Sequence, residues 1–395
     1  MALLSHSRLA PAMGRLGTET AFSVLAKAKE LERQGRDIVH LEIGEPDFDT
    51  PANIIDAAKR ALDAGYTHYG PSPGLPELRE VIARHIADTR GIDVGPENVV
   101  VTPGGKPIMY FGITALCGPG DEVLYPDPGF PIYQSVIEFV GATPVPLALR
   151  PENEFRLDLD ELNDKLTPRT KLLILNSPQN PTGGVLTPDD IRAIAGLVAD
   201  RDIYVLSDEI YGRIMYGEVE HASIAAVDGM QDNTIILDGF SKTYAMTGWR
   251  IGYGVMHPEL VEALAQLQTN VTSCTAAFTQ MAGIEALTGP QDAVGAMVAE
   301  FKARRDLIVD GLNAIEGVSC RRPAGAFYVF PQLEGFRLST GEIADLLLQE
   351  AGVAVLAGTA FGAVGTDSIR LSYANSQENL HKALDRMGEL LPTLR

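Results

Sequence analysis

A lysine, Lys242, follows a short apolar run at a position where its amine could do chemistry. The run at residues 234–237 is rich in β-branched residues and is typical of a buried strand. The stretch after it, residues 239–253, reads GFSKTYAMTGWRIGY. A lysine at a strand end is ordinarily a solvated residue on the rim of a sheet. These residues alone therefore leave a reactive amine and a rim lysine as alternatives.

Three other apolar runs also end in polar residues, and the chemistry of these ends is complementary. Residues 99–101 lead into TPGGK, residues 172–175 into NSPQNP, and residues 203–206 into SDEIY. In open α/β sheets, ligands bind beyond the carboxyl ends of the strands. We therefore expect one shared site that combines a glycine-rich loop, an amide, a carboxylate with a phenol, and a hydroxyl with an amine.

The glycine-rich loop and its neighbours predict a site for a single phosphate. Residues 104–106 (GGK) precede a helical pattern at 108–116, so backbone N–H groups and the helix dipole could hold an anion. Ser241 and Arg250 could add a hydroxyl and a fork-shaped cation. Pro107 breaks the Walker A pattern, no G-x-G-x-x-G follows a strand, and the pattern G-x-S-x-G lacks its last glycine. A phosphate beside an amine and a carboxylate is the ligand chemistry that remains.

The elements that must position these residues alternate along the chain. Short apolar strands are separated by amphipathic helical patterns, as expected for an open, mostly parallel sheet covered by helices. Two helix starts are marked by a hydroxyl residue followed by proline, at Thr50-Pro51 and at Thr187-Pro188. We expect the first to cap a helix at residues 52–64, and the whole pattern predicts an α/β fold.

The composition excludes several classes of partner. A chain of 395 residues is long enough for a two-domain enzyme. Its 32 basic and 52 acidic residues give a net charge of −20, which argues against nucleic acid and anionic membranes. The cysteines (Cys117, Cys274 and Cys320) lie far apart and the seven histidines are scattered, so we expect reduced thiols and no metal site. The weakly apolar N-terminus and the absence of any apolar run near ~20 residues predict a cytoplasmic protein.

Five motifs, in their order and spacing, resemble a known family. They are IGEPDFDTP, NSPQNPTGG, SDEIYGR, DGFSKTYAMTGWRIGY and IRLSYANS. The chain is similar, from about Ala21 to its C-terminus, to the fold-type I pyridoxal-phosphate-dependent aminotransferases of classes I and II, in the prokaryotic aspartate-aminotransferase-like subgroup. The resemblance implies a large cofactor domain at residues 44–287 with a mostly parallel seven-stranded sheet. It also implies a smaller α+β domain built from residues 1–43 and 288–395.

The resemblance implies a role for each residue of the predicted site. It implies that Lys242 forms the Schiff base with the cofactor, pyridoxal 5'-phosphate, and then moves the proton at the substrate Cα. It implies that Asp208 keeps the pyridine nitrogen protonated, so that the ring can act as an electron sink. Asn180 and Tyr211 match the hydrogen-bond donors to the ring 3-oxygen, and Phe130 stands where relatives stack an aromatic residue on the ring. Lys242, Asp208 and Tyr211 are thus the implied catalytic residues.

The remaining implied contacts concern the phosphate and the substrate. The implied cofactor-binding residues are Gly104, Gly105, Lys106, Phe130, Asn180, Asp208, Tyr211, Ser241, Lys242, Arg250 and the partner subunit's Tyr69. The implied substrate-binding residues are Gly44, Phe130, Asn180, Arg370 and Lys106. Arg370 is expected to clamp the substrate α-carboxylate, a bidentate task that lysine performs poorly. Because Tyr69 is expected to reach the neighbouring subunit's phosphate, the resemblance implies a homodimer with shared active sites.

The substrate side departs from the family pattern. Lys106 occupies a position that can meet a distal carboxylate in related enzymes, which favours aspartate or glutamate; whether it contacts the phosphate instead stays open. Pro107 replaces a common glutamine, and Ala21 stands near where such relatives offer a threonine. No second arginine can be placed opposite a dicarboxylate. Alanine, an aromatic or a branched amino acid therefore remain alternative substrates.

The expected function is amino-group transfer between an L-amino acid and a 2-oxo acid by a ping-pong mechanism, with aspartate or glutamate and 2-oxoglutarate as first choice. One alternative keeps the cofactor and changes the reaction, to a C–S lyase, another β-elimination enzyme or a cyclase. Another is a binding protein without turnover. The intact Lys242, Asp208 and Arg370 argue against that second alternative, as does the lack of an appended DNA-binding segment.

Overall fold

The middle of the chain forms one seven-stranded sheet in the computed structural model, which describes residues 9–217 and 219–395. Its strands are β2 (Val99–Thr102), β3 (Glu122–Asp127), β4 (Thr143–Ala148), β5 (Thr170–Asn176), β6 (Tyr204–Asp208), β7 (Thr234–Gly239) and β8 (Gly252–Val255). Their order in this central sheet is β2-β8-β7-β6-β5-β3-β4. Within it, β8 runs antiparallel to β2 and β7, and the other neighbours are parallel. The predicted mostly parallel sheet is confirmed.

These strand directions bring the polar strand ends together. Strands β2, β5, β6 and β7 point the same way, so their carboxyl ends lie at one edge of the central sheet. Because β8 runs the other way, its first residue, Gly252, lies at that same edge, and Arg250 enters there just before the strand. The prediction that the four strand ends meet at one rim is confirmed.

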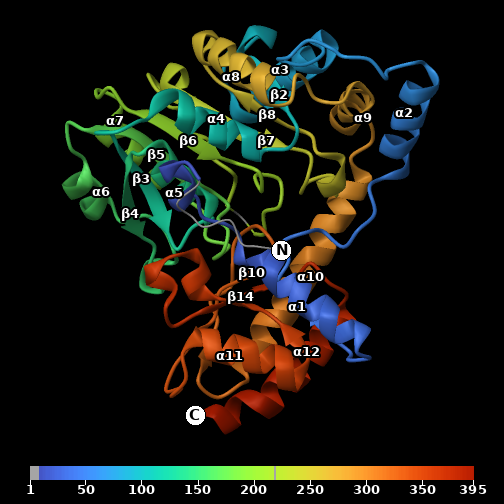
Figure 1. Ribbon diagram of the computed structural model, residues 1–395, viewed down its shortest axis with the longest axis vertical. Coiled ribbons are helices and arrows are strands. Elements are labelled where there is room, and N and C mark those ends of the chain that lie inside the picture. Colours follow the sequence, from blue (N-terminus) through green and yellow to red (C-terminus); the bar gives the residue numbers. More distant parts are fainter. Residues whose placement is uncertain (1–8, 218) are drawn as a thin grey trace.

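Helices cover both faces of the central sheet (Figure 1). One face packs against α4 (Lys106–Leu116), α5 (Ile132–Val140) and α8 (Pro258–Val271), and the other against α3 (Pro76–Arg90), α6 (Leu159–Lys165), α7 (Pro188–Val198) and α9 (Ala277–Thr288). Helix α2 (Ala52–Asp63) packs on α9. Strand residues alternate between the two cores: Val100 and Leu172 face the first set of helices, while Val99 and Leu173 face the second.

Both ends of the described chain build a smaller part below the central sheet (Figure 1). Its helices are α1 (Thr20–Arg33), α10 (Asp292–Asn313), α11 (Thr340–Leu346) and α12 (Gln377–Leu390). Its strands are β1 (Val39–His40), β9 (Val318–Ser319), β10 (Tyr328–Val329), β11 (Gln332–Leu333), β12 (Val353–Ala354), β13 (Leu356–Ala357) and β14 (Ile369–Ser372). Strand β1 pairs in parallel with β12, and β14 lies between β10 and β13. The division at residues 44–287 into two domains stays a prediction.

The helix starts test the capping predictions. At α7, the hydroxyl of Thr187 accepts a hydrogen bond from the backbone N–H of Asp190, as expected for a cap. At α2 the prediction is wrong, because the N-cap residue is Pro51 and has no side-chain bond, and the helix ends at Asp63. The Thr50 hydroxyl instead donates to the backbone oxygen of Ala245 at 2.6 Å, so it ties this loop to the segment after Lys242.

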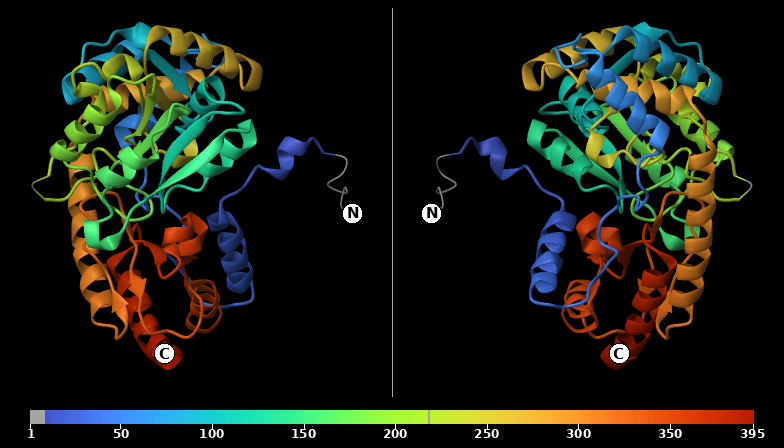
Figure 2. Two further views of the ribbon diagram at one scale, coloured as in Figure 1. Left: turned by 90° about the vertical axis from the view of Figure 1, so that its left-hand side faces the viewer. Right: turned by 90° about the vertical axis from the view of Figure 1, so that its right-hand side faces the viewer.

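The segment before α1, with a short 3-10 helix at Pro11–Gly14, projects outward from the rest of the molecule (Figure 2). Arg15 donates to the backbone oxygen of Glu138 at 2.8 Å, and the N–H of Gly17 donates to the Ser135 hydroxyl at 2.8 Å. Residues 1–8, part of the N-terminus on which the expectation of a cytoplasmic protein rests, lie outside the described residues. Among the residues that are described, none of the helices is both long and apolar enough to cross a membrane.

Candidate active site

A cavity of about 580 Å³ lies beyond the carboxyl ends of the central strands, between them and the smaller part. It is lined by the predicted site residues Gly44, Gly105, Lys106, Phe130, Asn180, Asp208, Tyr211, Ser241, Lys242, Arg250 and Arg370. Gly104 lies directly behind Arg250, and Tyr69 lies away from the cavity on the loop between α2 and α3, where it is 89% exposed. The fold therefore gathers nearly all of the predicted residues around one space.

Lys242 sits just past the end of β7 and points into this cavity. Its Nζ donates to the backbone oxygen of Gly44. Burial lowers the pKa of Lys242 to about 8; Glu45 opposes the shift, and the cations of Arg370 and Arg250 add to it. The neutral amine, which is the nucleophilic form, is therefore accessible near neutral pH. A lowered pKa and a place inside the cavity distinguish Lys242 from a solvated lysine on the rim of the sheet.

Asp208, the last residue of β6, is a buried carboxylate with neutral partners. Its Oδ2 accepts from the Tyr133 hydroxyl at 2.6 Å, and its Oδ1 accepts from the backbone N–H of Ile210 at 3.3 Å. Burial raises the pKa of Asp208 to about 6, although the bond from Tyr133 lowers it. A cationic nitrogen placed against this carboxylate would favour its ionised form. The site thus fits a protonated ring nitrogen.

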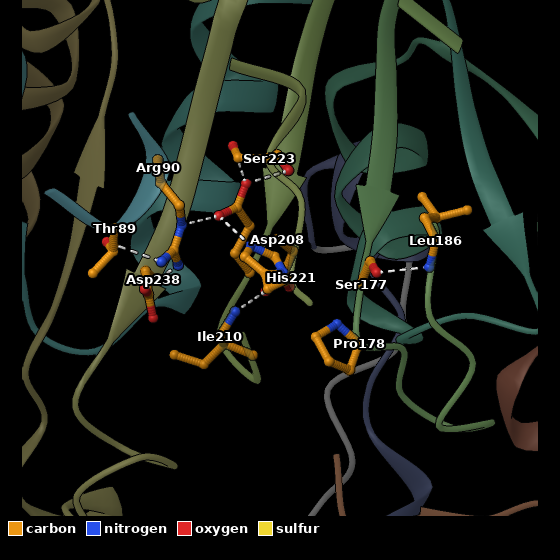
Figure 3. Close-up of polar contacts among 12 residues, drawn as sticks. Thr89, Arg90, Ser177, Pro178, Leu186, Asp208, Ile210, His221, Ser223 and Asp238 are labelled. Atoms are coloured by element: carbon orange, nitrogen blue, oxygen red, sulfur yellow. Dashed lines mark hydrogen bonds and ion pairs between the residues drawn. The ribbon is translucent and has the colours of Figure 1, made fainter. Parts of the chain in front are cut away.

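A buried ionic cluster adjoins Asp208 (Figure 3). Arg90 donates to Glu209 at 2.7 Å and to Asp238 at 3.2 Å. The Nε2 of His221 lies 2.8 Å from the same Glu209 oxygen. Burial raises the pKa of Glu209, but His221 and Arg90 outweigh burial and hold that pKa well below its usual range. The cluster therefore fixes charged groups at the ends of β6 and β7, next to the residues that line the cavity.

The glycine-rich loop and Arg250 form a close-packed cradle for an anion. Gly104 has a φ of +89°, and a Cβ there would overlap the Arg250 guanidinium. In the first turn of α4, Pro107 has no N–H and the Ile108 N–H donates to the backbone oxygen of Gly105 at 3.0 Å. The backbone N–H groups of Gly105 and Lys106, which have no partner among the described residues, and the helix dipole favour an anion. Ser241 and Arg250 line the adjoining wall of the cavity. This arrangement fits a phosphate.

Arg370 lies on β14 and enters the cavity from the smaller part. It is only 4% exposed, and its Nη2 donates to the backbone oxygen of Glu42. Its Nη1 donates to the Asn180 Oδ1 at 3.2 Å, which leaves the Asn180 amide nitrogen to donate elsewhere. The guanidinium carbon lies 4.7 Å from the ring centroid of Tyr328 and 4.8 Å from that of Phe361, and Nε has no partner among the described residues. A buried guanidinium held in this way is suited to a carboxylate.

The helix that carries Lys106 begins earlier than predicted. Lys106 is the first residue of α4, whereas the sequence pattern placed the start at residue 108. Its Nζ pairs with the Glu19 carboxylate and lies 5.5 Å from the ring centroid of Phe130 and 5.9 Å from that of Phe22. The side chain therefore faces the outer end of the cavity, on the side of α1.

Sequence reasoning missed three residues of this site. Tyr133 holds Asp208, and its only signal was its place in the same PDPGFPIY motif as Phe130. Tyr328 has its hydroxyl 2.7 Å from that of Tyr211, and it leaves no room for a side chain at Gly44. Glu19 had no signal, since it precedes a helix far from Lys106 in the sequence.

Comparison with known proteins places this geometry in a family. The family model described as aminotransferase class I and II matches residues 36–387. The aspartate aminotransferase of Pyrococcus abyssi is 42% identical over 93% of this chain and 95% of its own, and the aromatic-amino-acid aminotransferase 2 of Thermococcus litoralis is 41% identical over the same shares. The solved structure of the Thermus thermophilus aspartate aminotransferase with maleate is 40% identical, with a TM-score of 0.92, covering 96% of this chain and 99% of that one.

Proposed function

The chain belongs to the class I and II aminotransferases, and from this premise we propose that it moves an amino group between aspartate or glutamate and a 2-oxo acid. As a member of that family it has the fold-type I architecture and uses pyridoxal 5'-phosphate. The reaction is ping-pong, so the amino acid leaves as its 2-oxo acid before the acceptor binds. The observation that carries the proposal is one cavity that holds an amine of lowered pKa, Lys242, together with Asp208 and Arg370.

The residues of the cavity suit the two ends of the cofactor. Arg250, Ser241 and the loop at residues 104–105 would hold its phosphate, and Asp208 would hold its ring nitrogen. Asn180 and Tyr211 would bind the ring oxygen, and Phe130 would stack on the ring. When bound, the cofactor supplies an electron sink for the charge that develops at the substrate Cα.

Three groups of the chain then act on the amino acid. Arg370 binds the α-carboxylate and fixes the direction of the Cα–H bond. Lys242 would hold the cofactor covalently until the amino group of the substrate displaces its Nζ, and the freed neutral amine then takes the proton from the Cα. Asp208 would hold the ring nitrogen of the bound cofactor, and a cation at that place would stabilise the Asp208 carboxylate in its charged form. Tyr328 and Phe361 are buried and line the cavity, so they place aromatic surface around the reacting Cα.

An acidic substrate is favoured by the charge of Lys106 and by the relatives named aspartate aminotransferase. An aromatic substrate is the second candidate, because Phe22, Phe130 and Phe361 line the same cavity and one relative is named for aromatic amino acids. A C–S lyase would instead release pyruvate and ammonia from a cysteine conjugate without consuming a 2-oxo acid.

We also propose that the active unit is a homodimer and that it works in the cytoplasm. Tyr69 is 89% exposed in one chain, which suits a side chain that reaches a neighbouring subunit's phosphate. The cysteines form no disulfide among the described residues, and free thiols suit a reducing compartment. Sedimentation of wild type and Tyr69→Ala, with cofactor content measured in each, tests the dimer.

The visible absorption spectrum of the holoenzyme tests the function. Aspartate added without a 2-oxo acid should remove the visible band, and 2-oxoglutarate should restore it. Lys242→Ala should lose this cycle. A band that responds to no amino acid would overturn the proposed function, and a band that responds to phenylalanine but not to aspartate would replace the acidic substrate by an aromatic one.

A further inference from the structure

The outer end of the cavity carries an ion pair between Lys106 and Glu19, and the proposed function gives Glu19 no role. The charged side chains that line the cavity are Glu19, Glu45, Lys106, Asp208, Lys242, Arg250 and Arg370. This inference rests on the proposed function, in which Asp208, Lys242 and Arg250 bind the cofactor and Arg370 binds the substrate α-carboxylate. Glu45 is bound to the Thr247 hydroxyl. The substrate side chain therefore meets Lys106 and Glu19.

Lys106 and Glu19 neutralise each other in the structure. The Lys106 Nζ pairs with the Glu19 carboxylate, and the two side chains are 48% and 17% exposed. Glu19 precedes the first residue of α1 with an extended backbone, so its side chain reaches the cavity from the smaller part while Lys106 reaches it from the central sheet. The same ammonium lies over the rings of Phe22 and Phe130. An apolar surface and a neutralised cation thus lie side by side.

A ping-pong transferase must accept two different side chains in this one place, in turn. A lone ammonium would suit a dicarboxylate but would be left without a counter-charge under a neutral side chain. We propose that Glu19 is a specificity-determining residue that competes with the distal carboxylate of the substrate for Lys106. The pocket then serves both acidic and neutral side chains, with aromatic rings as the neutral class.

Neutral and acidic substrate side chains interact differently with the ion pair of Glu19 and Lys106. A neutral ring leaves the pair of Glu19 and Lys106 intact and packs on Phe22 and Phe130. A distal carboxylate takes the place of the Glu19 carboxylate at Lys106, and Glu19 turns toward solvent. Binding of an acidic side chain therefore breaks one ion pair to form another and brings two carboxylates close together. Glu19 acts as a repulsive element that reduces the preference for acidic substrates without abolishing it.

The test uses single turnovers of the holoenzyme, so that no 2-oxo acid competes for the pocket. The rate of loss of the visible band is measured against aspartate and against phenylalanine in wild type and in Glu19→Gln. The ratio of the two second-order rate constants, aspartate over phenylalanine, should rise in the variant by up to about five-fold, as expected for a partly exposed ion pair. The matched control is Glu30→Gln, which removes an exposed acidic partner of Arg33 on the same helix and should leave the ratio unchanged.

A second readout requires no turnover. Maleate, a dicarboxylate without an amino group, should bind the Glu19→Gln holoenzyme more tightly than wild type, also by up to about five-fold. In a Lys106→Met background, Glu19→Gln should no longer change either quantity, because the competition needs the ammonium. An unchanged aspartate-to-phenylalanine ratio, or weaker maleate binding in Glu19→Gln, would overturn the inference. Failure of the proposed function would look different, since the wild-type band would then respond to neither amino acid.

Discussion

The amine of Lys242 should titrate near pH 8, and this can be measured on the apoenzyme. Burial lowers the pKa of Lys242 to about 8, and the nearby cations of Arg370 and Arg250 contribute. With that pKa, about one-tenth of the amine is neutral at pH 7, whereas a free lysine near 10.4 is only about 0.04% neutral. At equal intrinsic reactivity, Lys242 should therefore capture an aldehyde on the order of 200 times faster than a free lysine at pH 7.

The assay mixes apoenzyme with pyridoxal phosphate from pH 6 to pH 10 and follows the visible band of the bound cofactor. The rate at each pH is divided by the rate of a free lysine derivative with the same aldehyde. This division cancels the pH dependence that comes from the aldehyde's own ionisable groups. This ratio should fall from about pH 8 upward, because Lys242 is by then mostly neutral while the free amine is still losing protons. In Glu45→Gln the pH above which this ratio falls should be lower than in wild type, since the Glu45 charge raises the pKa of Lys242. A ratio that stays constant up to pH 10 would refute the lowered pKa.

Three substitutions test other parts of the site. Arg370→Lys should raise the KM for amino acids about ten-fold or more while cofactor content stays intact, because one ammonium cannot replace a guanidinium bound to a carboxylate; steady-state kinetics measure it. Tyr133→Phe removes the donor to Asp208 and should weaken cofactor binding about ten-fold, measured by equilibrium dialysis. Arg90→Met leaves the Glu209 carboxylate buried without its guanidinium and should lower the free energy of unfolding by about 3–5 kcal/mol in urea titrations.

Matched controls separate these effects from general damage. Tyr125→Phe removes a hydroxyl that bonds Gln134 outside the cavity, so cofactor affinity should not change. Arg192→Met breaks an exposed pair with Asp189 and should change the unfolding free energy by no more than about 0.5 kcal/mol. An unchanged KM in Arg370→Lys would remove that residue from substrate binding. Equal losses of stability in Arg90→Met and Arg192→Met would mean that the buried cluster contributes no more than a surface pair.

Local sequence patterns were enough to predict the site residues that lie at the ends of the central strands. Asp208 and Lys242 follow apolar strands, and parallel strands have their carboxyl ends at one edge, so their convergence could be predicted without knowledge of the strand order. The cap at Thr187 was predictable because it depends only on neighbours in the chain. The cap at Thr50 was not, because a distant carbonyl at Ala245 takes its hydroxyl.

The parts that sequence reasoning missed depend on contacts between distant segments. Tyr328 faces Gly44 and Tyr211 only after the smaller part has packed beneath the central sheet. Glu19 reaches Lys106 across 87 positions, and no periodicity or cap links the two. The pairing of charges at the substrate end was therefore invisible in the sequence, although it bears on the choice of substrate.

The contact between Arg370 and the backbone of Glu42 joins residues that are 328 positions apart. A ribosome makes the chain from its N-terminus, and domains generally fold as units during synthesis. The strands that hold Lys242 and Asp208 are complete long before β14 emerges, whereas β1 must wait for β12 before it can pair. Arg370, which is proposed to bind the α-carboxylate, is therefore synthesised after the whole central sheet. A nascent chain, or one cut before β14, would fold its central sheet but would lack the arginine that binds the substrate.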